Sequence, residues 1–115
     1  MIKVSIFYAN REGSKFDLSY YLKSHIPMVQ KKLGASLIGG TVDQGLSSVE
    51  PGSRPKFVVM VHLLFDSLEA FQNAFVPHVE SFMTDMPNYT DILQPVIQIS
   101  EVKRLKLSLL TTSNT

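Results

Sequence analysis

The sequence has no cysteine among its 115 residues. Disulfide bonds, thiolate nucleophiles and cysteine-based zinc or iron–sulfur sites are therefore excluded. It also has no Gly-x-Gly-x-x-Gly and no phosphate-binding Gly-Lys-Ser, which disfavours nicotinamide and nucleotide binding. No two histidines have the spacing of a metal-binding pair, so a metal site would need ligands from three separate elements. We therefore expect neither a metal nor a cofactor.

Long apolar runs and a charge excess of one sign are also absent. No apolar stretch approaches the roughly 18 residues that span a bilayer, and residues 1–12 lack the features of a signal peptide. The net charge is only +1, and three of the eleven basic residues are Lys103, Arg104 and Lys106. The preceding chain has eight basic and ten acidic side chains, a net charge of −2. We expect a cytoplasmic protein that binds neither membranes nor nucleic acid.

The composition is that of one folded domain, with 44% hydrophobic and 18% charged residues. Helical periodicity predicts one helix from Asp17 to about Leu33. It predicts a second helix from Asp66, with Glu69 as its capping-box partner and Pro77 dividing it into two pieces. Alternating or continuous apolar patterns predict four strands, at residues 2–9, 37–44, 57–65 and 94–102.

The first predicted helix has an apolar stripe with a histidine at its border. Asp17 is expected to cap the helix and Gly34 to end it. The predicted buried stripe consists of Leu18, Leu22, Ile26, Val29 and Leu33. The predicted border consists of Tyr21, His25, Met28 and Lys32. Because Pro27 cannot donate a backbone hydrogen bond, a bend or loosened turn is expected beside His25.

The predicted order β-α-β-β-α-β is typical of an α+β, ferredoxin-like fold with a four-stranded antiparallel sheet. Two helices can cover only one face of such a sheet, and aliphatic residues from three strands suit that face. The other face, called the mixed face below, consists of Ser5, Phe7, Val58, Met60, His62, Leu64, Gln98 and Ser100. It is too apolar to be left in water, so we expect a homodimer in which a second copy covers it and encloses a small cavity.

Three histidines are the side chains that titrate near neutral pH. His25 is a candidate catalytic group with Tyr21, although it could equally be a core histidine with satisfied ring nitrogens. His62 is a candidate substrate contact or, alternatively, a polar group at the dimer interface. His78 is expected to be exposed and without function. Further candidate substrate contacts are Phe7, Met28, Met60 and Gln98.

Three segments in order resemble the EthD family. They are Phe16-Asp17 with Tyr20-Tyr21-Leu22 and His25-Ile26-Pro27; Phe65 to Phe71; and Pro87 to Asp91 followed by Pro95 to Val102. The resemblance covers residues 1–102 and implies a dimeric α+β barrel. It also implies a loose oxidoreductase label from a bacterial ether-degradation system, without a settled reaction. Only Tyr21 and His25 are carried over, as a pocket pair. Residues 103–115 depart from the family pattern and are expected to form a tail that is ordered only in its first part.

These observations predict a small catabolic enzyme without a cofactor, of the oxidoreductase, isomerase or lyase type. It would bind a small hydrophobic or aromatic metabolite between the first helix and the mixed face, with His25 as general acid and base. Tyr21 would orient His25 or stabilise an oxyanion. The alternative is a carrier or auxiliary protein that binds such a metabolite for a partner oxygenase. Haem binding is a third alternative, which requires one histidine as an axial ligand.

Overall fold

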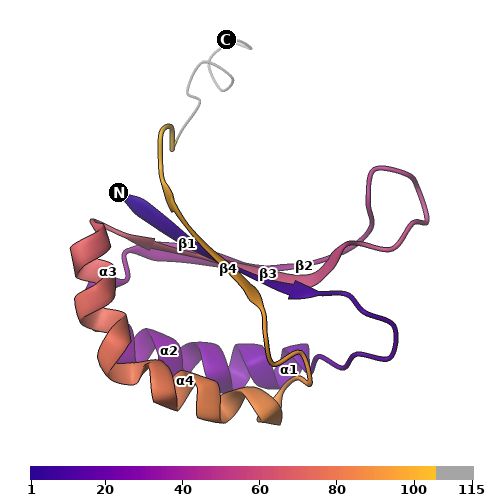
Figure 1. Cartoon of the computed structure of the whole chain (residues 1–115), viewed down its shortest axis with the longest axis horizontal. Helices are drawn as coiled ribbons and strands as arrows, with labels where there is room; N and C mark the ends of the chain where they lie inside the picture. Colours follow the sequence, from indigo (N-terminus) through magenta and orange to yellow (C-terminus); the bar gives the residue numbers. More distant parts are fainter. Residues whose placement is uncertain (106–115) are drawn as a thin grey trace.

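A computed structural model gives the structure of the protein and describes residues 1–105. One antiparallel sheet has the strand order β2-β3-β1-β4, and all the helices lie on one of its faces (Figure 1). The strands are β1 (Ile2–Ala9), β2 (Gly39–Gln44), β3 (Phe57–Phe65) and β4 (Val96–Glu101). This arrangement confirms the predicted α+β, ferredoxin-like fold. The prediction for the tail falls largely on residues 106–115, which lie outside the described residues.

Two of the strands begin later than the sequence predicted. β2 begins at Gly39 rather than at residue 37, because the chain after the first helix forms a short 3-10 turn, Gly34–Ser36. β4 begins at Val96, directly after Pro95, which has no N–H to donate to a ladder. The middle strands β1 and β3 have the predicted bounds.

The first helix contains a wide turn at the predicted position. It consists of α1 (Leu18–Tyr20), a π-helical turn η1 (Tyr21–His25) and α2 (Ile26–Leu33). The N–H of Ile26 donates to the carbonyl of Tyr21, five residues earlier. The prediction of a loosened turn beside His25 is therefore confirmed, as is the cap, since Asp17 accepts from the N–H of Tyr20.

The π turn changes which face of the first helix is buried. Because it has more residues per turn than an α-helix, residues four apart stay on one face. The buried residues are therefore Tyr21, His25, Val29 and Leu33. Leu22, predicted in the stripe, is 47% exposed, so that part of the prediction is wrong. Tyr21 and His25, predicted at the border of the stripe, therefore lie on the buried face, whereas Lys32 stays exposed.

The second helical segment is divided at Pro77, as predicted. It consists of α3 (Leu68–Phe75), a 3-10 turn η3 (Val76–His78), α4 (Val79–Asp85) and a further 3-10 turn η4 (Met86–Asn88). The predicted capping box of Asp66 and Glu69 is wrong. The cap is Ser67, whose backbone is extended and whose Oγ accepts from the N–H of Ala70 at 3.0 Å.

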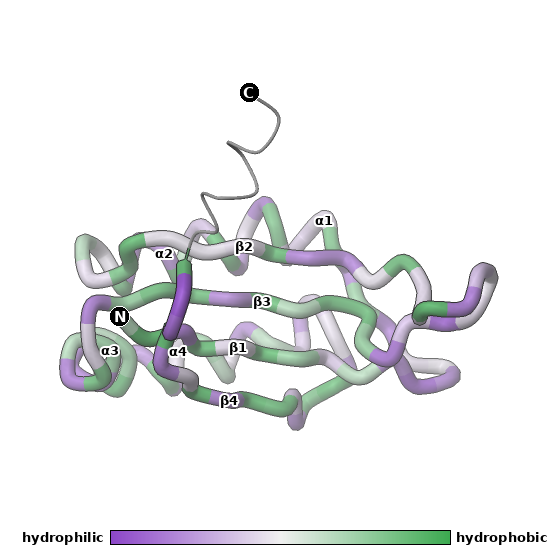
Figure 2. Tube along the Cα trace, turned by 90° about the horizontal axis from the view of Figure 1, so that it is seen from above, coloured by the Kyte–Doolittle hydropathy of each residue, from purple (hydrophilic) through white to green (hydrophobic). Residues whose placement is uncertain are grey.

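The core lies between the helices and one face of the sheet. Register pairs such as Val4 with Leu63 and Ile6 with Val61 place aliphatic side chains on this face. Figure 2 looks onto the mixed face, with the helices behind the sheet. Within residues 1–105 no helix or strand covers the mixed face. No helix in this range is long and apolar enough to cross a membrane.

Candidate functional site

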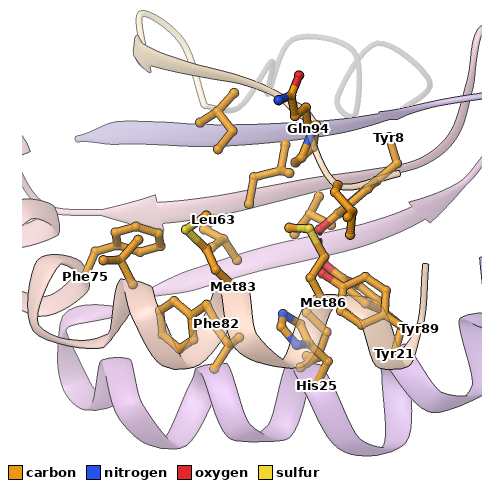
Figure 3. A pocket seen from close by; sticks show the side chains of 18 residues that line it. Tyr8, Tyr21, His25, Leu63, Phe75, Phe82, Met83, Met86, Tyr89 and Gln94 are labelled. Atoms are coloured by element: carbon orange, nitrogen blue, oxygen red, sulfur yellow. Dashed lines mark hydrogen bonds between the residues drawn. The ribbon is translucent and has the colours of Figure 1, made fainter. Parts of the chain in front are cut away.

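A cavity of about 340 Å³ lies between the helices and the aliphatic face of the sheet (Figure 3). Side chains from β1, β3, β4, α2 and α4 line it, and most of them are aliphatic or aromatic. The polar side chains in the lining are His25, Tyr8, Tyr21, Tyr89 and Gln94. No lysine, arginine, aspartate or glutamate of the described chain is among them. The cavity therefore suits an apolar molecule with one polar end.

His25 is held in the cavity wall by a carboxylate. Its Nδ1 lies 2.8 Å from Oδ2 of Asp85, at the end of α4. The other carboxylate oxygen, Oδ1, accepts from the hydroxyl of Tyr20 at 2.7 Å and from the side-chain amide of Asn88 at 3.0 Å. Asp85 is thus fixed from three sides, and it fixes the plane of the His25 ring.

The protonation states follow from burial and from these hydrogen bonds. Burial lowers the pKa of His25 below its ordinary 6.5, and the hydrogen bond and charge of Asp85 oppose only part of this effect. Desolvation acts to raise the pKa of Asp85, but the hydrogen bonds from Tyr20, Asn88 and His25 together outweigh it and lower this pKa. At neutral pH, Asp85 is therefore an anion and His25 is neutral, with its Nδ1–H donated to Asp85.

The second ring nitrogen of His25 remains open to the cavity. In neutral His25 with a proton on Nδ1, Nε2 carries a lone pair and is an acceptor. Nε2 has no hydrogen-bond partner within residues 1–105. No side-chain nitrogen or oxygen of this range is both fully buried and unpaired, so Nε2 keeps access to the cavity. This is the arrangement of an oriented general base.

Two tyrosines contact His25, and a third, Tyr8, contacts both of them. Tyr21, four residues earlier in the π turn, stacks on the imidazole with ring centroids 5.1 Å apart. The ring of Tyr89 lies 4.6 Å from that of His25 and 4.7 Å from that of Tyr21, and its hydroxyl shares a hydrogen bond of 2.9 Å with that of Tyr8. Burial raises the pKa of Tyr8, Tyr21 and Tyr89. These hydroxyls therefore remain protonated and can donate hydrogen bonds.

The structure brings together only two of the predicted site residues. His25 and Tyr21 line the cavity, whereas Met28 faces a polar groove between α2 and α4, on the outer side of the helices. Four predicted contacts lie across the sheet, on the mixed face: Phe7, Met60, His62 and Gln98. The predicted pocket between the first helix and the mixed face is therefore wrong. Successive strand residues point to opposite faces, and the helices pack on the aliphatic one.

The mixed face has a polar cluster of its own. Ser5 Oγ and His62 Nδ1 share a hydrogen bond of 2.7 Å, and Nε2 of His62 lies 3.6 Å from Oδ2 of Asp43. His78, expected to be exposed, is half-buried, with its ring centroid 6.2 Å from that of Phe82. Within residues 1–105 no group of three or more histidine, aspartate and glutamate residues could hold a metal ion.

Sequence reasoning missed Asp85, Tyr8 and Tyr89. A weak signal for Asp85 exists, because it lies three residues after Phe82 and helical spacing places it beside the buried stripe. Strand alternation places Tyr8 on the aliphatic face of β1, but alternation alone gives it no role. Tyr89 lies in a loop, where no periodicity indicates direction.

The fold and the site define a small α+β protein with a histidine-bearing apolar cavity beneath its sheet. The EthD domain model matches residues 14–92, and the chain belongs to the EthD family. The crystal structure of an EthD-like protein from Ralstonia eutropha JMP134 is 43% identical, with a TM-score of 0.83, and the match covers 90% of this chain and 94% of that chain.

Two more distant structures share the fold alone. One is an ethyl tert-butyl ether degradation (EthD) family protein from Bacillus halodurans C-125, 20% identical with a TM-score of 0.60, over 89% of this chain and 98% of that chain. The other is At3g17210 from Arabidopsis thaliana, 13% identical with a TM-score of 0.63, over 93% of this chain and 100% of that chain. A comparison with curated proteins found no match.

Proposed function

We propose that this protein is an enzyme that moves a proton on a small, mostly apolar metabolite, with His25 as its general base and acid. The observation that most supports this proposal is that the two ring nitrogens of His25 have different surroundings. Nδ1 is held by Asp85 at 2.8 Å, and Nε2 has access to the cavity. The depressed pKa of His25 keeps the base form available at neutral pH.

In the proposed reaction, Nε2 of His25 removes a proton from an acidic C–H bond of the substrate. The electron pair of that bond moves onto a neighbouring carbonyl oxygen, which becomes an enolate oxyanion. A hydroxyl of Tyr8 or Tyr89 donates a hydrogen bond to this oxygen. Asp85 stabilises the imidazolium, which returns the proton to another atom of the substrate. The net result is an isomerisation, and it requires no oxidant and no cofactor.

The rate acceleration that one general base can supply restricts the class of substrate. General acid–base catalysis contributes about 10²–10⁴-fold, which suits an activated carbonyl compound or phenol and is too little for an inert alkyl ether. Oxidation of an ether would need an oxidant from elsewhere, such as a partner oxygenase. A proton-transfer role therefore agrees better with the site than unassisted ether cleavage.

We also propose that the protein forms a homodimer through the mixed face. Phe7, Met60 and Leu64 are only half-buried there and would be covered by a second copy. The reaction proposed for the cavity uses none of the other predicted substrate contacts, because Met28 faces the outer groove and the other four residues lie on the mixed face: His62, Phe7, Met60 and Gln98. Sedimentation measurements at micromolar concentration test the dimer, and a species of 12.9 kDa alone would contradict it.

Deuterium exchange into 1-phenyl-2-propanone tests the proposed reaction. This ketone has an aryl group for the apolar cavity and C–H bonds beside a carbonyl. In deuterated buffer at neutral pH, proton NMR should show faster exchange with the wild-type protein than without it. His25→Gln should lower the protein-dependent rate by about 10²–10⁴-fold, because glutamine keeps the polarity of the side chain and cannot act as a base.

Binding of the same ketone, followed by NMR line broadening, separates a catalyst from a carrier. A catalyst should keep its affinity within a few-fold in His25→Gln while the exchange rate falls. If the wild-type protein binds the ketone and does not accelerate exchange, or if His25→Gln exchanges at the wild-type rate, the proposed function is wrong and the carrier alternative gains support.

A further inference from the structure

All the polar side chains of the cavity lining except Gln94 are buried. His25, Tyr8, Tyr21 and Tyr89 are only 2–5% exposed, although they carry ring nitrogens and hydroxyls. In Figure 3, Gln94 lies across the cavity from His25, and Gln94 is exposed. A molecule that pairs with the buried nitrogen and hydroxyls must therefore enter with its polar group first.

The open end of the cavity is bordered by apolar side chains that face solvent. Val79 and Met83 come from α4, Leu93 from the following loop and Ile97 from β4; we call these four residues the rim. They line the cavity and are nevertheless 36–61% exposed. The apolar surface is therefore continuous from the inside of the cavity to its outside.

We propose that the substrate is an elongated amphipathic molecule, with a hydroxyl or enolisable carbonyl at one end and an unbranched apolar tail at the other. The head is held by His25 and the tyrosines, and the tail leaves the cavity between Met83 and Ile97 and lies on the rim. This proposal rests on the proposed function for the chemistry of the head group. It adds the class of substrate to that function.

The dimensions and the charge of the site support a tail of this kind. The cavity volume of about 340 Å³ is near the lower end of the range of about 300–1,000 Å³ for ligand sites, so a longer molecule must extend onto the rim. The lining within residues 1–105 holds no charged lysine, arginine, aspartate or glutamate. A charged tail would lose its hydration there without gaining a partner, so the tail is apolar.

A series of 4-alkylphenols, from phenol to 4-hexylphenol, tests the proposal on the full-length protein. Their hydroxyl can donate to Nε2 of His25, and the alkyl chain lengthens by one methylene at a time. Dissociation constants from calorimetry should fall about fourfold for each methylene that becomes buried, and this trend should continue to the longest members. No binding, or no gain beyond ethyl, would overturn the proposal.

Two neighbouring residues of β4 provide a matched pair of variants. Ile97 and Val96 are 56% and 55% exposed, but their side chains point to opposite faces of the sheet. Ile97→Thr should weaken the longest phenol at least about fourfold and leave phenol itself within about twofold, whereas Val96→Thr should change neither. Met83→Gln, on the exposed side of α4, should reproduce the effect of Ile97→Thr without depending on the sheet.

The outcomes separate this proposal from the proposed function. The gain per methylene is a binding measurement, so it should persist in His25→Gln, where exchange is lost. A gain that is the same in Ile97→Thr, Met83→Gln and wild type would overturn the rim as a tail site, even if His25 proves catalytic. The proposal also fails if Ile97→Thr changes only the sedimentation of the protein, because the rim would then be a contact between copies.

Discussion

His25 and His62 lie on opposite sides of the same sheet, and each has an aspartate beside it. The His25 side chain is 6% exposed, and its Nδ1 lies 2.8 Å from Asp85. The His62 side chain is 24% exposed, and its Nε2 lies 3.6 Å from Asp43, which is itself 45% exposed. A carboxylate at hydrogen-bond distance in a water-poor site orients the ring and stabilises its cation. A half-exposed pair at ion-pair distance is screened by water.

The two histidines also differ in their second nitrogen. Nε2 of His25 has access to the cavity, whereas Nδ1 of His62 is already bonded to the hydroxyl of Ser5. Similar residue types therefore give a histidine with one nitrogen open to a buried cavity on one side of the sheet, and a histidine whose Nδ1 is already bonded on the other. What separates them is burial, one short hydrogen bond and one nitrogen left open.

The largest expected difference between the two sites is in reactivity. Asp85→Asn should lower the exchange rate of 1-phenyl-2-propanone by at least about 10²-fold. An amide facing Nδ1 can donate to it, which moves the ring proton to Nε2 and removes the acceptor lone pair from the cavity. Asp43→Asn, the matched change across the sheet, should leave the rate within about twofold.

The pH profile distinguishes this positioning role of Asp85 from a merely structural one. In Asp85→Asn the cation of His25 loses its anionic partner, which lowers the pKa of His25 further. The pH at which the residual activity falls should therefore move to a lower value, whereas a merely structural role of Asp85 would not move it in this way. Circular dichroism should show the same helix content as in wild type. An exchange rate lowered equally by Asp43→Asn would contradict the comparison of the two sites.

The next largest difference is in stability. Leu63 and Leu64 are neighbours on β3 and point to opposite faces, with Leu63 buried in the core and Leu64 half-buried on the mixed face. Leu63→Ala should lower the free energy of unfolding by about 2–5 kcal/mol, because it leaves a cavity that the packed core cannot fill. Leu64→Ala should cost about half as much or less in a single chain.

Urea unfolding followed by circular dichroism at several protein concentrations measures both variants. If a second copy covers the mixed face, the cost of Leu64→Ala should increase with the population of dimer. If Leu63→Ala and Leu64→Ala lower the free energy of unfolding equally at concentrations where sedimentation shows only monomer, the assignment of Leu64 to an uncovered face is wrong.

Much of the fold could be predicted because strand alternation and turn residues act locally. The bounds of β1 and β3, the cap at Asp17 and the division at Pro77 all agree with the sequence pattern. The loosened turn was predictable because Pro27 lacks a donor. The resulting change in which face of the first helix is buried was not predictable, because it depends on which carbonyl accepts from the N–H of Ile26.

The candidate site was predicted only in the part that one helix supplies. Tyr21 and His25 lie four residues apart, so helical spacing alone pairs them. Asp85 contacts His25 from 60 residues away, and a single sequence does not record such a contact. The location of the pocket was wrong because the mixed face has the more varied side chains, whereas the helices pack on the aliphatic face and the cavity lies between them.

A smaller effect of the His25 site should appear in the pH dependence of stability. Because burial lowers the pKa of His25 below 6.5, the unfolded chain binds a proton there before the folded chain does. The contribution of neutral His25 to the free energy of unfolding is therefore fully present above about pH 6.5. It decreases as the pH falls from that value to the pKa of His25 in the folded state. His25→Gln should reduce this decrease. Thermal unfolding between pH 7.5 and pH 5 measures it, and an unchanged slope in His25→Gln would contradict the assignment.

The smallest expected effect concerns single hydroxyl groups on the two sides of the sheet. Tyr89→Phe removes a partner from the buried hydroxyl of Tyr8 and should cost about 1–3 kcal/mol, because water cannot replace the lost hydrogen bond. Ser5→Ala removes the hydroxyl bonded to His62, whose ring is still reached by water, and should cost only about 0.5–1.5 kcal/mol. Urea unfolding of both variants at low protein concentration gives the comparison. If Ser5→Ala costs as much as Tyr89→Phe, water does not reach His62, and the mixed face must be covered under those conditions.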